Sequence, residues 1–177
     1  MRGQGPALDY GRVGIDLELA DVAAAKYQLR DCQAAGGWCG HEPDCEAHLW
    51  RLLSLGPSEF PVRRFYDINE TMQLTGMGYD AEPVPWLDFL RDAGEPSRHQ
   101  VFLRWRMQTV PGKTGIPSFK LLSNDRWLVT AYEIDEALAA YAEVPAEQKA
   151  ILETNARWAS WLEWLALARE RGGFEAE

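Results

Sequence analysis

Most segments of this chain place their apolar residues at helical spacing. Leu19, Val22 and Tyr27 set this spacing near the N-terminus, and the Gly-Gly pair that follows is suited to end the helix. Farther along, a proline opens and a glycine closes two more apolar stripes, as expected at the two ends of a helix. The pattern predicts helices over about 17–34, 43–55 and 85–95, with a turn or two of helix at 68–74.

One segment has the period of a strand instead. Between 101 and 108, Val, Leu, Trp and Met alternate with Phe, Arg, Arg and Gln, which predicts a strand with one buried face. The sequences SFKLL and RWLVT flank an Asn-Asp turn and predict two further short strands. Together these segments predict a small antiparallel sheet at about 99–130.

The C-terminal part is predicted to be helical again. Thr130 and Glu133 have the spacing of a capping box, which begins a helix over 131–144. The stretch 145–171 then reads as one long helix that begins at a proline and ends at a Gly-Gly pair. It carries three tryptophans three residues apart, which favours deep packing on a core, with one exposed anchor for another chain as the alternative: Trp158, Trp161 and Trp164.

These elements define an α+β fold: a mainly helical single domain, 1–177, with one small sheet. We expect a zinc-stabilised helical part at 1–56, a connecting segment with a short helix at 57–97, and the sheet with two C-terminal helices at 98–177. The chain is 46% hydrophobic and has eight tryptophans, enough material for one substantial core.

The composition also bears on location. The chain has no apolar run of ~20 residues, which predicts that nothing spans a membrane. Its first ten residues, MRGQGPALDY, lack the apolar core of a secretory signal, which favours a cytoplasmic protein. Three cysteines agree with that location, because an odd number cannot all pair within one chain.

All three cysteines and two of the three histidines fall between positions 32 and 48. Cys45 and His48 are three residues apart on a predicted helix, so their side chains can reach the same ion. We predict a zinc ion held by Cys32, Cys39, Cys45 and His48, with His41 as the reserve ligand. Three thiolates and one imidazole fill a tetrahedron, so the metal would be structural. Unligated buried thiols and a redox pair are the alternatives.

The interval C-x6-C-x5-C-x2-H resembles the Cys-Cys-Cys-His zinc fingers that bind RNA. Those fingers have three residues, not two, between the last cysteine and the histidine. The resemblance covers 17 residues and implies zinc binding more than RNA binding.

A basic segment interrupts this acidic chain. The net charge is −9, yet residues 98–130 hold six basic side chains and one acidic one. The candidate partner-binding residues are Phe102, Arg104, Arg106, Lys120 and Arg126. They could contact a nucleic-acid backbone, an acidic protein partner or the acidic helices of the same chain. In a chain of this charge, we favour the internal or protein pairing over nucleic acid.

No familiar catalytic pattern accompanies these residues. The chain has no Ser-His-Asp order, paired-carboxylate motif or glycine-rich phosphate loop, and VPGKTG lacks a P-loop because Met107 stands where its first glycine belongs. The sequence therefore favours a zinc-stabilised protein that binds another protein or assembly, such as a bacterial or phage regulator or inhibitor. A nucleic-acid-binding module is the second hypothesis. An enzyme with a carboxylate-based site that sequence cannot pick out is the third.

Overall fold

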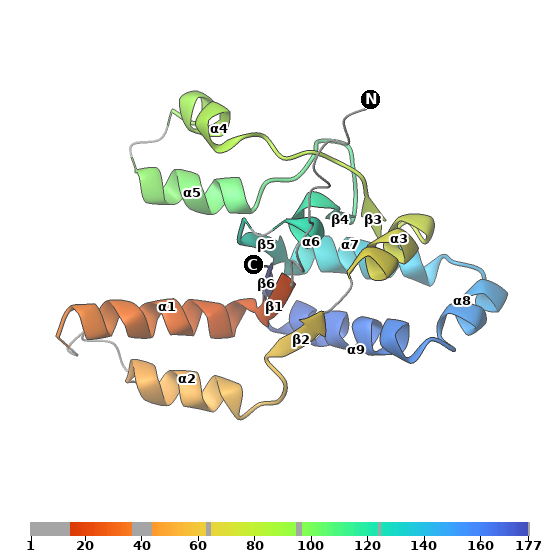
Figure 1. Ribbon diagram of the computed structural model, residues 1–177, viewed down its shortest axis with the longest axis horizontal. Coiled ribbons are helices and arrows are strands. Elements are labelled where there is room, and N and C mark those ends of the chain that lie inside the picture. The colour runs from red at the N-terminus through yellow and green to blue at the C-terminus, as the bar shows by residue number, and fades with distance from the viewer. Residues whose placement is uncertain (1–14, 37–43, 63–64, 95–96, 124, 177) are drawn as a thin grey trace, which may run out of the picture.

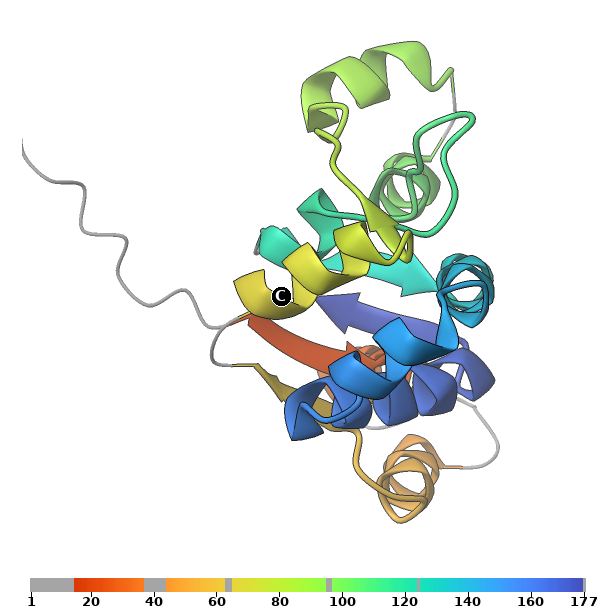
Figure 2. The ribbon, with the colours of Figure 1, turned by 90° about the vertical axis from the view of Figure 1, so that its right-hand side faces the viewer.

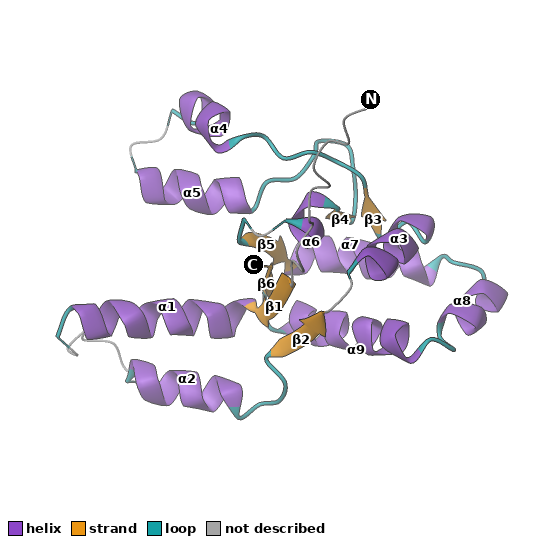
Figure 3. Cartoon of the chain, in the orientation of Figure 1, coloured by secondary structure: helices purple, strands orange, loops and turns teal. Residues whose placement is uncertain are grey.

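The computed structural model describes residues 15–36, 44–62, 65–94, 97–123 and 125–176. Its main sheet has four strands in the order β2-β1-β6-β5, and every neighbouring pair is antiparallel. The strands come from both ends and the middle of the chain (Figure 1): β1 (Ile15–Leu19), β2 (Glu59–Val62), β5 (Trp127–Thr130) and β6 (Gly173–Ala176). The predicted α+β class is confirmed, since helices surround this small antiparallel sheet (Figure 3).

The predicted position of the sheet at 99–130 was wrong. Residues predicted to form its first strand form helix α5 (Arg98–Arg106) instead. Val101 and Trp105 are buried one helical turn apart, whereas Leu103 and Met107 are 40% and 44% exposed. Four alternating residues fit a strand, but the two that reach the core here also fit an i, i+4 helical face.

The predicted hairpin around the Asn-Asp turn was also wrong. Its first half is a short helix, α6 (Phe119–Leu122), which follows strand β4 (Ile116–Pro117). Strand β4 pairs in parallel with β3 (Gly78–Tyr79) in a separate two-stranded sheet. The second half is strand β5, but it pairs with the C-terminal strand β6. Gly173 permits that pairing, because it has φ +112° and a Cβ there would lie 2.1 Å from the Val129 carbonyl oxygen.

Near the N-terminus, the predicted helix at 17–34 begins later, as α1 (Ala20–Ala34). The residues before it form β1, in which Leu17 and Leu19 face the core and Glu18 faces the other side. Helix α2 (Cys45–Leu53) confirms the second predicted helix, and its N-cap Asp44 accepts a hydrogen bond from the Glu46 N–H at 3.0 Å.

The remaining helices follow the sequence signals closely, with one exception. The described elements are α3 (Tyr66–Leu74), α4 (Trp86–Asp92) and α7 (Ala131–Ala142), and α7 has the predicted capping box. The long helix predicted over 145–171 is instead two helices, α8 (Ala146–Leu152) and α9 (Ala156–Glu170). Asn155 separates them because its side chain accepts hydrogen bonds from the first N–H groups of α9 at 3.0 and 3.4 Å.

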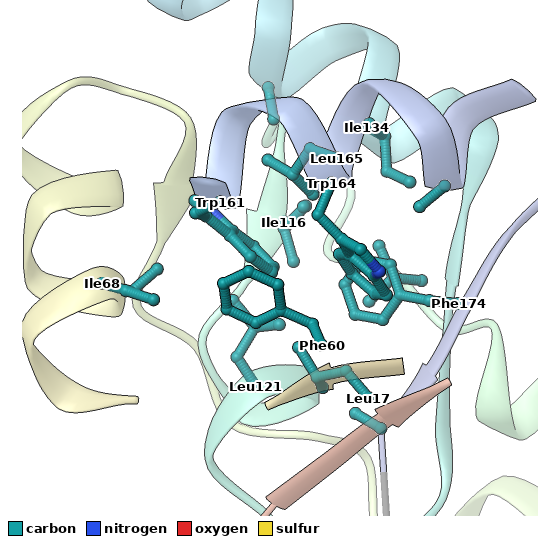
Figure 4. Packing of buried hydrophobic residues seen from close by; sticks show 14 of the residues in the cluster. Leu17, Phe60, Ile68, Ile116, Leu121, Ile134, Trp161, Trp164, Leu165 and Phe174 are labelled. Carbon is teal, nitrogen blue, oxygen red and sulfur yellow. The ribbon is translucent and has the colours of Figure 1, made fainter. Parts of the chain in front are cut away.

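The hydrophobic core lies between one face of the main sheet and α9. Trp158, Trp161 and Trp164 are all at least 95% buried, so their predicted core role is confirmed and the exposed-anchor alternative is wrong. Trp161 meets Phe60 edge to face at 5.2 Å between ring centroids, and Trp164 meets Phe174 at 4.9 Å (Figure 4). Among the described residues, no helix has the length and apolarity to span a bilayer.

Helices α4 and α5 lie side by side and project from the body of the molecule (Figures 1 and 2). We call residues 84–94 and 97–107 the arm. A second cluster of buried aromatic side chains joins the arm to the body, and Trp105 packs on Trp127 at 4.4 Å between ring centroids. The arm is therefore attached through aromatic packing and not only through its connecting loops.

Candidate functional site

The structure separates the five predicted partner-binding residues. Phe102 and Arg104 are exposed on α5 of the arm, whereas Arg106 at the end of α5 and Lys120 on α6 are buried. Arg126 lies in the turn before β5 with φ +59°, and its guanidinium lies over the Tyr27 ring. The single basic strand face expected from the sequence is therefore not present.

Arg106 is held inside by a buried polar network. Its guanidinium Nη2 lies 2.7 Å from Glu175 Oε1, and its Nε donates to the Arg126 carbonyl oxygen. Glu175 also accepts a hydrogen bond from the Tyr27 hydroxyl at 3.2 Å. Burial, and then the negative charge of Glu175, raise the pKa of the Tyr27 phenol. Sequence reasoning missed Glu175 and Tyr27 because they are 148 positions apart.

The positive charge of Lys120 is likewise paired with a buried carboxylate. Its Nζ donates to both carboxylate oxygens of Glu133, at 2.7 and 3.0 Å, and to the Leu128 carbonyl oxygen at 2.8 Å. Burial lowers the pKa of Lys120, and the negative charge of Glu133 opposes that shift. Of the six cations in 98–130, at least these two serve the interior and not an outer surface.

The predicted zinc ligands are described only in part. Cys39 and His41 lie outside the described residues. Cys32 in the last turn of α1 and Cys45 at the start of α2 are both buried, with their Sγ atoms 2.9 Å apart. His48 is one turn farther along α2, and its Nδ1 lies 3.0 Å from Arg51 Nη2. Within the described residues, no group of three or more His, Cys, Asp or Glu side chains could hold a metal. Because Cys39 is not among those residues, the complete zinc site is not tested and stays a prediction.

Three carboxylates lie in register across the outer face of the sheet, another feature that the sequence did not reveal. Glu18 is paired with Glu59 on one side and with Glu175 on the other, across β2, β1 and β6. They border a small polar cavity of about 170 Å³ below α1. Lys26 forms ion pairs with Glu18 and, at 3.7 Å, with Glu59. A cation lies beside each of these three carboxylates. The carboxylates therefore belong to a charge network that joins α1 to the sheet.

The arm also borders an open groove. A groove of about 600 Å³ is lined by Trp86, Arg98, His99, Phe102, Trp105 and Asp125. The Trp86 ring meets those of Phe102 and Trp105 edge to face, at 5.9 and 5.8 Å. Trp105 Nε1 donates to the Val84 carbonyl oxygen at 2.8 Å, which fixes the ring. The groove therefore has rigid aromatic walls with charged groups at its rim.

Large apolar side chains are also exposed on the arm. Leu87 is 75% exposed, and Phe102, Leu103 and Met107 are 37–44% exposed. Arg98, His99 and Arg104 lie among them, all exposed. The arm thus combines apolar area, aromatic rings and positive charge in one projecting element.

Comparisons with protein-family models, with curated proteins and with solved structures found no match to this chain. Its function is therefore inferred from these surfaces and contacts.

Proposed function

We propose that this chain is a non-catalytic interaction protein that docks on another protein through its arm. The partner's contact surface would be acidic around an apolar centre. The observation that carries the proposal is that the arm exposes several large apolar side chains, from α4 to the end of α5. A protein that acts by docking in this way would suit a regulator or inhibitor.

The apolar side chains support a docking role because exposed apolar patches usually mark interaction sites. Leu103 and Met107 are four residues apart at the end of α5, so they share one side of the arm. Trp86 and Phe102 line the groove of the arm. Aromatic side chains in such settings tend to contribute most of the binding free energy.

The charge of the arm indicates the chemistry of the partner. Helix α5 contains three arginines and no acidic residue, in a chain with a net charge of −9. Arg106 is used internally, whereas Arg98 and Arg104 are exposed. A local positive surface on an acidic protein attracts acidic partners and directs them to that surface.

The way the arm is held also favours binding. Trp105 packs on Trp127 of the body, and the Val84 N–H donates to Gln108 Oε1 at 2.7 Å. These contacts order the arm before a partner arrives. A preordered surface loses less conformational entropy on binding, which improves affinity.

Co-purification of tagged protein from the cells that encode it tests the proposal. We expect one protein to be retained by the wild type and by Leu74→Glu, which changes an exposed leucine of the body. The same protein should be lost with Leu103→Glu, which places a negative charge on the arm. Retention by all three would contradict the proposal, and retention of nucleic acid in its place would favour the nucleic-acid-binding hypothesis.

We further propose that one structural zinc joins the ends of α1 and α2 through Cys32, Cys39, Cys45 and His48. The buried sulfurs of Cys32 and Cys45 support it, because two zinc ligands must lie close together. Cys32 is disulfide-bonded in this structure, so zinc binding would require that bond to be reduced first. Thiolates bound to one tetrahedral zinc are about 3.8 Å apart. The 2.9 Å separation would therefore have to widen by about 0.9 Å when the ion binds.

A further inference from the structure

The two edges of the main sheet differ in how their backbone groups are covered. At the β5 edge, the Leu128 carbonyl accepts from Lys120 Nζ at 2.8 Å, and the Arg126 carbonyl accepts from Arg106 Nε. At the β2 edge, no hydrogen bond among the described residues reaches the backbone N–H or C=O of Glu59. Among the described residues, side chains therefore cover the β5 edge and leave the backbone groups of Glu59 at the β2 edge unbonded.

The register shows which groups of β2 point outward. The Leu19 N–H donates to the Ser58 carbonyl at 2.9 Å, so Ser58 faces β1. Backbone groups alternate along an antiparallel strand, so those of Glu59 and Pro61 point away from β1. Pro61 has no N–H, which fits an outward position. The open edge therefore presents the N–H and C=O of Glu59 and the C=O of Pro61.

A groove runs beside this edge. It has a volume of about 610 Å³ and lies between β2 and α9. Phe60, Trp164 and Leu167 supply its apolar lining, while Ser160 and Glu163 of α9 stand on its exposed side. The groove lies on the same face of the sheet as the Phe60 side chain. A fifth strand added to β2 would therefore direct every second side chain into it.

We propose that the β2 edge and this groove bind an extended segment of another protein as a fifth strand. In that segment, apolar side chains face Phe60 and Trp164, and a basic side chain between them lies opposite Glu59. The Glu59 side chain lies 3.7 Å from Lys26 on the other face and is still 66% exposed there, so it can meet a second cation. This site lies away from the arm and does not depend on the docking function of the arm.

The charge of Glu59 argues against a second copy of this chain as the occupant. Two β2 strands paired antiparallel about Glu59 would place the two carboxylates directly opposite each other, which is destabilising. The flanking Pro57 and Pro61 would also supply no N–H donors to the new ladder. An alternating apolar–basic–apolar segment has neither defect.

Fluorescence polarisation with a labelled peptide, Thr-Val-Lys-Val-Thr with blocked ends, tests the proposal. We expect saturable binding to the full chain at a peptide concentration below about 1 mM. N-methylation of the backbone nitrogen of the lysine removes the N–H that would donate to the Glu59 carbonyl. It should weaken binding about tenfold, the equivalent of one hydrogen bond. This control changes the peptide alone, so the folding of the protein is not in question.

Protein variants complete the test. Ser160→Trp should fill the groove and abolish binding, and Glu59→Lys should make the protein prefer the peptide with Glu in place of Lys. The arm variant Leu103→Glu should bind the peptide like the wild type, which separates this site from the arm. Absence of binding to wild-type protein, equal binding of the N-methylated peptide, or unchanged binding by Ser160→Trp would each overturn the proposal.

Discussion

Lys120 and Glu133 form an ion pair inside the protein, with their side chains 0% and 1% exposed. The pair does more than cancel two charges. Glu133 Oε2 also accepts from the Thr130 N–H at 2.8 Å and the Thr130 hydroxyl at 2.9 Å. Because Lys120 also bonds the Leu128 carbonyl, the two side chains tie α6, β5 and the start of α7 together.

This arrangement predicts that removing one partner destabilises the protein more than removing both. Lys120→Met leaves a buried carboxylate without its cation and should lower the free energy of unfolding by about 3–5 kcal/mol. The double variant Lys120→Met/Glu133→Leu should be more stable than that single variant, although it loses the capping box, worth about 1 kcal/mol. Urea unfolding measures both, with the exposed Lys113→Met as the control. A double variant less stable than Lys120→Met would contradict this account.

Two arginines on α5 should differ in how their replacement by Glu affects stability and partner binding. Arg106→Glu places a second carboxylate beside buried Glu175 and should destabilise the fold by at least about 3 kcal/mol. Arg104→Glu, at an exposed position, should lower the melting temperature far less than Arg106→Glu and should weaken partner binding, with a smaller effect at high salt. Thermal melts and a binding titration on both variants measure this. The prediction fails if Arg104→Glu unfolds the protein or Arg106→Glu leaves its stability intact.

The ionisation of the Tyr27 phenol should contribute to the loss of stability at alkaline pH. Its pKa is raised in the folded protein by burial and by Glu175, against lowering by Arg126 and Arg106. Its stabilising contribution is therefore complete below the unfolded pKa of about 10 and is lost as pH rises through the higher folded value. Tyr27→Phe should reduce the loss of unfolding free energy between about pH 9 and about pH 11. An identical loss in both proteins would show that Tyr27 does not contribute to it.

The zinc proposal predicts about one zinc per chain in untagged protein. Removing the metal with a chelator, or changing Cys45→Ser, should lower the melting temperature, because metal affinity contributes to folding free energy. His48→Ala should lose the metal and His41→Ala should keep it. Elemental analysis without zinc, together with free titration of all three thiols, would rule the site out.

Local signals predicted the helices well because each signal acts within a few residues. The Thr130–Glu133 capping box was readable at a spacing of three, and the structure confirms both of its hydrogen bonds. Asn155 shows the limit of such reading. Its capping bonds end one helix and begin another within a stretch whose apolar pattern continues on both sides.

The sheet could not be located from the sequence, because its strand pairs join distant positions. Strand β6 pairs with β1 and β5, so Phe174 lies opposite Leu19 across most of the chain length. Strand β1 is also short and runs directly into α1, so its period is easily assigned to the helix. The fates of Arg106 and Lys120 depend on Glu175 and Glu133, and burial of this kind follows only from the tertiary fold.

Site-specific photo-crosslinking in the native cells tests the central claim, that the arm is the docking surface. A photoreactive phenylalanine would replace Leu87 or Leu103 on the arm, and Leu74 or Ile151 on the body, four exposed positions. We predict that both arm positions crosslink to the same protein and that neither body position does. Crosslinking of that protein from the body but not the arm, or no crosslinked protein from any of the four positions, would contradict the account.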